Sequence, residues 1–259
     1  MILLLDIGNT NTHLGLADDK RILRQVDMPT RAWHKGALAN ITRFTRGSDA
    51  KINSAAVCSV VPAATPVVLN FLRKRFCADP LELTPKTLSS VGIDYPRPWT
   101  IGPDRLANAA AARVHFGAPV VVVDFGTAVT FDVVNRTGNY VGGIIAPGLT
   151  AMTEYLHEKT ALLPKIRIAE VESAIGKSTR EAMLIGAVHG YRGLIRELIS
   201  EVKAELRVRK LPVIATGGYA ALIAAKLPEI TAVDPLLTLE GLRICHAARE
   251  LRQRGYPCG

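Results

Sequence analysis

The sequence predicts an α/β protein made of two related subdomains, and three observations carry this prediction. Apolar strand patterns alternate with helical patterns along the chain, which is typical of sheets flanked by helices. One strand–turn–strand unit occurs twice, at the beginning and near the middle of the chain. The 259 residues, 48% hydrophobic and 21% charged, have the composition of a soluble globular protein with one large domain or two modest ones.

Strands are predicted where short apolar or alternating runs end at turn residues. These runs are residues 2–6, 11–17, 21–27, 51–60, 139–146 and 212–218, and the repeated unit supplies two more within 119–134. Helices are predicted at 31–46, 62–76, 104–116, from Pro147 onward, at 177–207 and at 236–254. Residues 93–103 contain three prolines and predict an ordered loop without regular structure.

The repeat relates "MILLLDIGNTNTHLGLA" at the N-terminus to "PVVVVDFGTAVTFDVV" at 119–134. In each copy an apolar strand ends in Asp, Gly follows two positions later, and a second strand resumes after Thr-rich positions. Three pairs share an offset of 118 positions: Asp6 with Asp124, Gly8 with Gly126, and Thr12 with Thr130. This spacing is too long for a solenoid repeat and favours two related subdomains. We expect them to comprise residues 1–116 and 117–259.

Each repeated turn has the residue types that a phosphate site needs. Gly lets backbone N–H groups approach a phosphate, Thr and Asn add donors, and the Asp at the strand end can hold a metal ion or its water shell. A single such turn is equally typical of an ordinary hairpin. Two copies, one at the start of each half, favour a clamp that binds a polyphosphate from both sides.

The stretch "IGPDRLANAAAA" places Asp104 at a helix start, and two interpretations stay open. As a capping residue, Asp104 would only satisfy backbone N–H groups, with Arg105 in solvent. As a functional residue, it would accept the proton of a hydroxyl nucleophile while Arg105 binds an anionic group of the substrate.

Two glycine motifs differ in what they predict. The stretch "GKST" (176–179) is not a Walker A motif, because Val171 stands where that motif needs Gly and no clear strand leads into the turn. The stretch "ATGGYAAL" (215–222) lies between a strand and a helix, as either a tight turn or a shelf for a nucleotide base or ribose. The His residues form no HExxH motif, and no GxSxG elbow for a hydrolase is present.

Composition argues against several classes of function. The four cysteines, at 58, 77, 245 and 258, have neither CxxC nor zinc-finger spacing, so structural zinc and a disulfide framework are not expected. The net charge of +9 comes from basic residues spread along the chain, which favours an anionic small molecule over nucleic acid. No apolar run approaches about 20 residues and no signal peptide is recognisable. We therefore expect no membrane partner and a cytoplasmic location.

With "DIGNTNT", "GPDR" and "DFGTAVT" in this order, the sequence resembles the type III pantothenate kinases, a branch of the acetate kinase–hexokinase–actin superfamily. The resemblance continues through "NYVGGIIAPGLTAM" and "TALLP", so it covers nearly the whole chain. It implies two RNase H-like subdomains with mixed central sheets flanked by helices, and a homodimer. The implied reaction is phosphorylation of pantothenate by ATP, the first step towards coenzyme A.

The resemblance also implies roles for individual residues. Asp6 resembles the acid that lies beneath the phosphates of ATP and holds Mg²⁺ through water, and Asp104 resembles the catalytic base. Asp124 resembles the acid associated with a monovalent cation, K⁺ or NH₄⁺. The further positions that resemble ATP contacts are Ile7, Gly8, Asn9, Thr10, Asn11, Thr12, His13 and Thr127. The positions that resemble pantothenate contacts are Tyr95, Gly102, Pro103, Asp104, Arg105 and Thr179.

Two positions depart from the family pattern. Pro103 stands where the family often has a small non-proline residue, which should stiffen the loop without removing a needed group. His13 lies at a variable position, so its phosphate role depends on this sequence alone.

Together, these implied roles predict a mechanism of in-line phosphoryl transfer. Asp104 takes the proton of the primary hydroxyl of pantothenate as that oxygen attacks the γ-phosphate, while Mg²⁺ and the two turns offset the phosphate charge. The alternatives are a kinase for another small hydroxylated substrate, a polyphosphate hydrolase, a non-enzymatic transcriptional accessory factor and an actin-like filament subunit. A binding-only protein has no need for the carboxylates of Asp6, Asp104 and Asp124 together.

Overall fold

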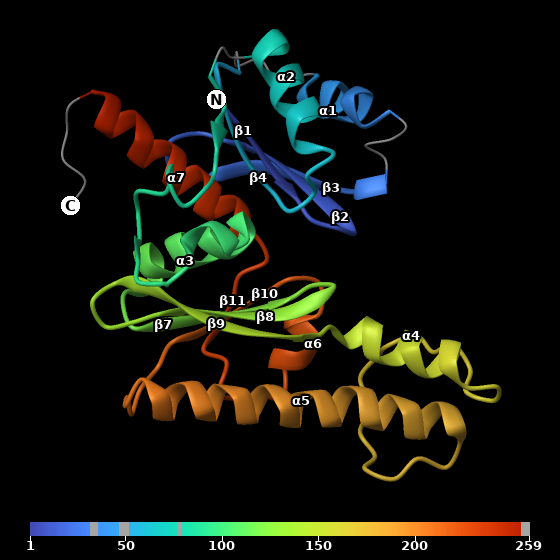
Figure 1. Cartoon of the computed structure of the whole chain (residues 1–259). Coiled ribbons are helices and arrows are strands. Elements are labelled where there is room, and N and C mark those ends of the chain that lie inside the picture. The colour runs from blue at the N-terminus through green and yellow to red at the C-terminus, as the bar shows by residue number, and fades with distance from the viewer. Residues whose placement is uncertain (32–35, 47–51, 77–78, 255–259) are drawn as a thin grey trace. The chain divides into compact units, whose positions relative to one another are not determined.

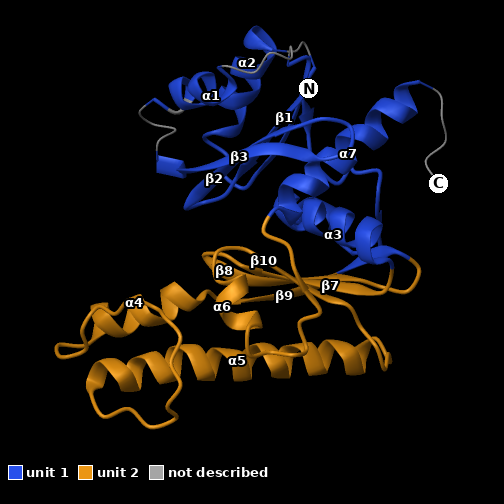
Figure 2. Cartoon of the chain, turned by 180° about the vertical axis from the view of Figure 1, so that it is seen from behind, with its two compact units in different colours: residues 1–117, 138–141, 236–259 blue, residues 118–137, 142–235 orange. Residues whose placement is uncertain are grey.

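The computed structural model describes residues 1–31, 36–46, 52–76 and 79–254 (Figure 1). Contacts divide the chain into two compact units, which Figure 2 colours separately. Unit 1 consists of residues 1–117, 138–141 and 236–259, and unit 2 of residues 118–137 and 142–235. The predicted division at residue 116 concerns the sequence repeat and stays a prediction. Part of the predicted helix at 31–46 lies outside the described residues, as do Cys77 and Cys258.

Unit 1 is built on a five-stranded mixed sheet with the strand order β3-β2-β1-β4-β5. The first three strands form an antiparallel meander, whereas β4 runs parallel to β1 and β5 runs parallel to β4. The strands are β1 (Ile2–Ile7), β2 (Asn11–Ala17), β3 (Ile22–Pro29), β4 (Ser54–Ser59) and β5 (Leu81–Glu82).

Two layers of helices cover the two faces of this first sheet. The helices are α1 (Ala37–Thr45), α2 (Thr65–Arg75), α3 (Pro103–Phe116) and α7 (Leu237–Gln253). Leu3, Leu5 and Ile7 belong to an apolar core that also contains residues of α1 and α2. Helix α7 packs on β1, β2 and β4, and α3 packs against α7 and β4. Because strand side chains alternate between faces, Asp6 lies on the α3–α7 face, opposite the α1–α2 core.

The second sheet has six strands in the order β11-β10-β7-β8-β9-β6. The strands are β6 (Gly92–Ile93), β7 (Val120–Phe125), β8 (Ala128–Val134), β9 (Asn139–Pro147), β10 (Val213–Thr216) and β11 (Ala232–Val233). Without β6, the order β9-β8-β7-β10-β11 repeats the order of the first sheet. The repeat seen in the sequence therefore extends to the topology of both sheets.

Three helices belong to unit 2: α4 (Leu149–Lys159), α5 (Thr179–Glu205) and α6 (Ala220–Ala224). The ring of Tyr191 on α5 lies 6.3 Å from the ring of Phe125 at the end of β7. Its hydroxyl donates to the carbonyl oxygen of Pro147 at 3.1 Å. This long helix therefore closes one side of the second sheet. Within the described residues, no helix is both long and apolar enough to cross a membrane.

The structure adds short elements and moves one predicted helix start. Strands β5, β6 and β11 have two residues each, too few for a periodic pattern. The predicted loop at 93–103 contains the end of β6 and a 3₁₀ turn, η2 (Pro98–Thr100). The prediction that a helix starts at Pro147 is wrong, because Pro147 ends β9 and α4 begins at Leu149. A strand end tolerates proline, which has no N–H to donate to a neighbouring strand.

Candidate active site

The first Asp-Gly turn connects β1 to β2 and is held from the end of β3. The Gly8 N–H donates to the Asn11 carbonyl at 3.0 Å, which closes the turn. Thr30 supports it from beside, because its hydroxyl donates to the Gly8 carbonyl at 2.6 Å and its N–H to the Thr10 carbonyl at 2.9 Å. Asn9, Thr10 and Asn11 are exposed on the turn. The turn is therefore a fixed frame with polar side chains open to a ligand.

Two residues predicted to contact ATP are instead buried beneath this turn. Thr12 and Ile7 are both 0% exposed, and the Thr12 hydroxyl lies 3.1 Å from the Thr30 hydroxyl. Thr12 thus braces the turn through Thr30, and we leave its side chain out of the phosphate contacts proposed below.

Asp6, at the end of β1, lies between polar residues of neighbouring strands. The Cys58 thiol on β4 donates to Asp6 Oδ1 at 3.2 Å. Burial, followed by the charges of Asp6 and Asp104, raises the pKa of Cys58 well above its usual value, so the sulfur keeps its proton. On the other side of Asp6, His13 Nδ1 lies 2.7 Å from Asp27 Oδ1.

The second Asp-Gly turn, between β7 and β8, fits tightly against two glycines of unit 2. A Cβ on Gly148 would lie 2.2 Å from the carbonyl oxygen of Thr127. Gly217 has a φ of +88°, and a Cβ there would lie 2.6 Å from Asp124 Oδ1. The start of α4 and the turn after β10 therefore both abut the segment 124–127. Thr127 itself is exposed.

The two turns differ in length by one residue, which corrects one detail of the repeat. Asp6 pairs with His13, whereas Asp124 pairs with Thr130. The structural counterpart of Thr130 is therefore His13, not Thr12, because the second turn is shorter. The first strands keep the offset of 118, and the second strands are offset by 117.

Helix α3 positions the predicted base at its first turn. Pro103 occupies the first helical position and Gly102 the N-cap, so Asp104 is not the cap residue. The Asp104 carboxylate accepts the Arg105 N–H at 2.9 Å. Burial raises the pKa of Asp104, although the backbone bond and the charge of Arg105 act in the opposite direction. A carboxylate kept from water in this way is a stronger base than an exposed one.

An aromatic pair lies beside Arg105 in the same unit. The rings of Tyr95 and Tyr140 make an edge-to-face contact at 6.2 Å, and the Arg105 guanidinium lies 5.8 Å from the Tyr140 ring. Strand β6 runs parallel to β9, with Ile93 opposite Tyr140, and thereby brings the segment before Tyr95 to this point. Sequence reasoning missed Tyr140, because an aromatic residue in an alternating strand gives no signal of its own.

The "GKST" stretch is the start of α5 and not a phosphate loop. Ser178 is the N-cap, and its hydroxyl oxygen accepts the Glu181 N–H at 3.2 Å. Glu181 in turn accepts the Lys177 N–H at 2.7 Å. The rejection of a Walker A motif is confirmed, since residues 161–178 contain no strand. Thr179 is exposed at the first position of the helix.

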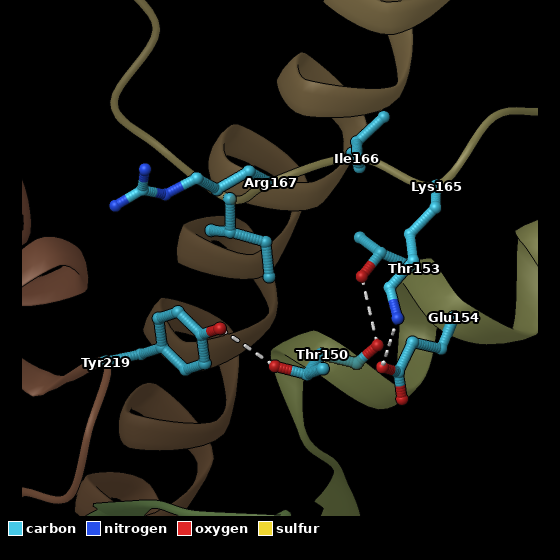
Figure 3. Close-up of a pocket in the computed structure, with 8 residues that line it drawn as sticks. Thr150, Thr153, Glu154, Lys165, Ile166, Arg167 and Tyr219 are labelled. Atoms are coloured by element: carbon cyan, nitrogen blue, oxygen red, sulfur yellow. Dashed lines mark hydrogen bonds and ion pairs between the residues drawn. The ribbon is translucent and has the colours of Figure 1, made fainter.

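Unit 2 has a cavity of about 470 Å³ beside the Gly-Gly turn (Figure 3). Its lining residues are Thr150, Thr153, Glu154, Lys165, Ile166, Arg167, Ile168 and Tyr219. Figure 3 shows Thr150 and Tyr219 pointing toward one another, and their hydroxyls are 2.9 Å apart. Lys165 forms an ion pair with Glu154 at 3.7 Å. Aromatic, hydroxyl and cationic groups thus surround one space.

The predicted site residues divide between the two units. Unit 1 holds the first turn, Tyr95 and the segment 102–105, whereas unit 2 holds Asp124, Thr127 and Thr179. Within the described residues, no cluster of three or more His, Cys, Asp or Glu side chains could hold a metal ion by itself. A metal at either turn would therefore need oxygen atoms from a bound ligand, from the backbone or from water.

Solved structures with similar folds are known. The chain superposes on a putative Baf family transcriptional activator from Campylobacter jejuni with a TM-score of 0.61 and 21% identity, covering 97% of this chain and 98% of that one. A putative 2-dehydro-3-deoxygalactonokinase from Sinorhizobium meliloti gives a TM-score of 0.57 at 12% identity, covering 98% and 100%. MreB 5 of Spiroplasma citri gives 0.56 at 9%, covering 98% of each chain. These similarities confirm the predicted fold class, α/β with two mixed sheets flanked by helices.

Sequence comparisons are more specific. The chain is 47% identical to a type III pantothenate kinase from Akkermansia muciniphila, over 93% of this chain and 96% of the relative. It is 39% identical to one from Methylacidiphilum infernorum, over 99% and 94%. The sequence model of the type III pantothenate kinase family matches residues 2–201. The chain therefore belongs to the type III pantothenate kinase family.

Proposed function

We propose that this protein transfers the γ-phosphate of ATP to the primary hydroxyl of pantothenate, with Asp104 as the general base. The observation that carries the proposal is the environment of Asp104, a partly buried carboxylate whose pKa is raised and which lies beside Arg105. Family membership supplies the substrates, and this local geometry supplies a group able to take the proton. The product, 4'-phosphopantothenate, begins coenzyme A biosynthesis.

The acceptor substrate would be bound by the groups around α3. Pantothenate carries a carboxylate, which the Arg105 guanidinium matches in charge. Tyr95 is exposed and offers an apolar surface to the body of the substrate, and the buried ring of Tyr140 supports both Tyr95 and Arg105 from beneath. Gly102 and Pro103 fix the entry to the helix. The family resemblance implies a further contact from the hydroxyl of Thr179.

Both Asp-Gly turns would contribute to binding ATP. On the first turn, the side chains of Asn9, Thr10 and Asn11 donate to phosphate oxygens, His13 flanks them, and Ile7 and Gly8 form the base of the turn. On the second, Thr127 supplies a donor. The cavity beside Tyr219 suits the nucleoside end, because an aromatic ring and the Arg167 guanidinium stack well on a base. Under this proposal, the "ATGGYAAL" stretch (215–222) is a shelf for the nucleotide base or ribose and not only a tight turn.

The two acids at the strand ends fit the implied cations. Mg²⁺ is usually bound through one or two carboxylates plus substrate phosphates, so Asp6 beside the first turn is a suitable partner through water. It would supply positive charge to the phosphates during transfer. K⁺ or NH₄⁺ would be held at Asp124, with the backbone oxygens of Gly126 and Thr127 in the same turn.

We further propose that the protein acts as a homodimer in the cytoplasm. Several large apolar side chains are exposed on α4 and on the segments before and after it: Ile145, Met152, Tyr155, Leu156, Leu162 and Ile175. Of the α4 side chains, only those of Leu149 and Thr153 are buried. A second copy of the same chain would cover these apolar groups in a self-complementary interface.

A coupled assay tests the proposal. ADP production is followed with ATP and pantothenate, with ATP alone, and with other small hydroxylated acids, in potassium and then in sodium buffer. We expect ADP formation that depends on pantothenate and is faster with potassium. Equal ATP consumption without pantothenate would indicate a hydrolase, and a preference for another acid would assign a different acceptor. Phosphopantothenate absent from both buffers would overturn the proposal.

A further inference from the structure

Four polar side chains form a row across the first sheet at the end of β1. Asp6 lies opposite Cys58 of the parallel strand β4 and opposite His13 of the antiparallel strand β2. His13 lies opposite Asp27 of β3. Residues opposite one another in antiparallel strands share a face and have Cβ atoms about 5 Å apart. We call these four residues, Cys58, Asp6, His13 and Asp27, the polar row.

The outer members of the polar row each bond to an inner member. The Cys58 thiol, 0% exposed, donates to Asp6 Oδ1 at 3.2 Å. At the other end, His13 Nδ1 lies 2.7 Å from Asp27 Oδ1. Because a carboxylate accepts hydrogen bonds, His13 carries a proton on Nδ1 in this pair. Any contact of His13 with a phosphate therefore goes through Nε2.

We propose that Cys58 and Asp27 are positioning residues: Cys58 holds Asp6 in the orientation that meets the Mg²⁺ of the nucleotide through water, and Asp27 holds His13 in the orientation that meets the phosphates. The inference rests on the proposed function, because it takes Asp6 and the first turn as the phosphate site. Neither outer residue touches the nucleotide itself. Cys58 fixes one oxygen of the Asp6 carboxylate, and Asp27 fixes the tautomer and ring orientation of His13.

The second turn shows that this arrangement is specific to the first. The counterpart of Asp6 is Asp124, and the residue opposite Asp124 on the antiparallel strand is Thr130, a neutral hydroxyl. On the parallel strand, Asp124 lies opposite Thr216 instead of a cysteine. Of the two turns, only the first combines an imidazole with a carboxylate partner that orients its ring. The polar row thus distinguishes the two halves of the repeat chemically.

Calorimetric titration with the non-hydrolysable β,γ-imido analogue of ATP and Mg²⁺ tests the row without requiring turnover. Asp27→Ala should raise the Kd by about 10-fold, the size of effect typical of partners that orient a ligating group. Asp27→Asn should raise it less, because the amide oxygen still accepts from Nδ1. Cys58→Ala should weaken binding similarly, and Cys58→Ser should restore most of it through its hydroxyl donor.

Matched controls separate positioning from general damage. Gln25→Ala changes an exposed residue on the same face of β3, opposite Gly15. Cys245→Ala removes another buried thiol, which lies 3.3 Å from the Ser90 hydroxyl. Both should leave the Kd unchanged. Thermal unfolding of every variant shows that the fold is retained.

A double-mutant cycle with His13→Gln decides whether Asp27 acts through His13. In the His13→Gln protein, Asp27→Ala should have no further effect on the Kd or on the KM for ATP, and the KM for pantothenate should not move. Additive effects, or an unchanged Kd in Asp27→Ala and Cys58→Ala, would overturn the inference. A wild-type protein that binds the analogue but does not phosphorylate pantothenate would instead contradict the proposed function alone.

Discussion

At the scale of single residues, we predict that catalysis requires the Asp104 carboxylate and that the charge of this carboxylate lowers the stability of the fold. Asp104→Asn keeps the oxygen that accepts from Arg105 but cannot take a proton, so kcat should fall about 10²–10⁴-fold. Folding raises the pKa of Asp104 above its usual 3.8, so the ionised form costs stability once the pH exceeds the folded value. The variant should therefore unfold at the same or a higher temperature at pH 7, as circular dichroism can measure.

The matched control for Asp104 is Asp19→Asn, a change at an exposed carboxylate that should affect neither kcat nor melting. The melting advantage of Asp104→Asn should shrink as the pH falls below the folded pKa, because the wild-type carboxyl then takes up a proton in the folded state. A variant with turnover within about 10-fold of wild type would remove Asp104 from the role of base.

At the residue scale, the sequence identifies reactive groups in unusual motifs well. It is less informative about which face of a strand a side chain occupies. The place of Asp104 at a helix start leaves the capping and functional interpretations open, and the resemblance to the family implies the role of base. The structure makes Gly102 the N-cap in its place. Thr12 was grouped with its neighbours, although strand alternation turns its side chain beneath the turn. Tyr140, Cys58 and Asp27 were missed because their significance depends on residues of other strands.

At the scale of elements, the crossing of α3 and α7 depends on Gly241. A Cβ at this position would lie 2.0 Å from the Ala107 carbonyl oxygen. Gly241→Ala must therefore push the two helices apart, and we expect a loss of about 1–3 kcal/mol in the free energy of unfolding. Gly193→Ala on α5, where the added methyl meets no atom within 4 Å, should instead stabilise by about 0.5–1 kcal/mol. Denaturant titration measures the free energy of unfolding of both variants. Equal changes in the two would contradict the close crossing of α3 and α7.

The segment before α5 is held by an ion pair between the Glu170 carboxylate and the buried Arg192. Arg192 is 4% exposed and makes two bonds with Glu170, at 3.0 and 2.6 Å. The bonds to Arg192 lower the pKa of Glu170 to about 2 from 4.5. Its stabilising effect is therefore complete above about pH 4.5 and declines as the pH falls toward 2.

Glu170→Gln should lower the free energy of unfolding at pH 7 by about 1–3 kcal/mol, because it leaves the Arg192 charge without its carboxylate. The difference from wild type should narrow as the pH falls below 4.5. Glu172→Gln, at an exposed side chain paired with Lys226, should cost less than about 1 kcal/mol. Unfolding by urea across pH 3–7 measures both, and a constant difference across that range would contradict the linkage.

At the scale of the whole molecule, the exposed apolar side chains around α4 predict self-association. Tyr155 is 61% and Leu162 90% exposed. Light scattering should give twice the chain mass of 27.9 kDa for the wild type. The double variant Tyr155→Glu and Leu162→Glu should give the mass of one chain, because burying two carboxylates in an apolar interface is unfavourable. Leu251→Glu on α7 is the control, and a monomeric wild type would contradict the dimer.

The sequence by itself determined the chain's family, its α/β class and its internal repeat, because strand alternation, Asp-Gly turns and ordered motifs are local properties of the chain. Tertiary structure alone decided which residues meet. It placed Asp6 beside Cys58, His13 opposite Asp27 and Arg105 beside Tyr140. It also made the second turn one residue shorter than the first. Strand register and burial fix these contacts, and both arise only when segments distant in the sequence pack together.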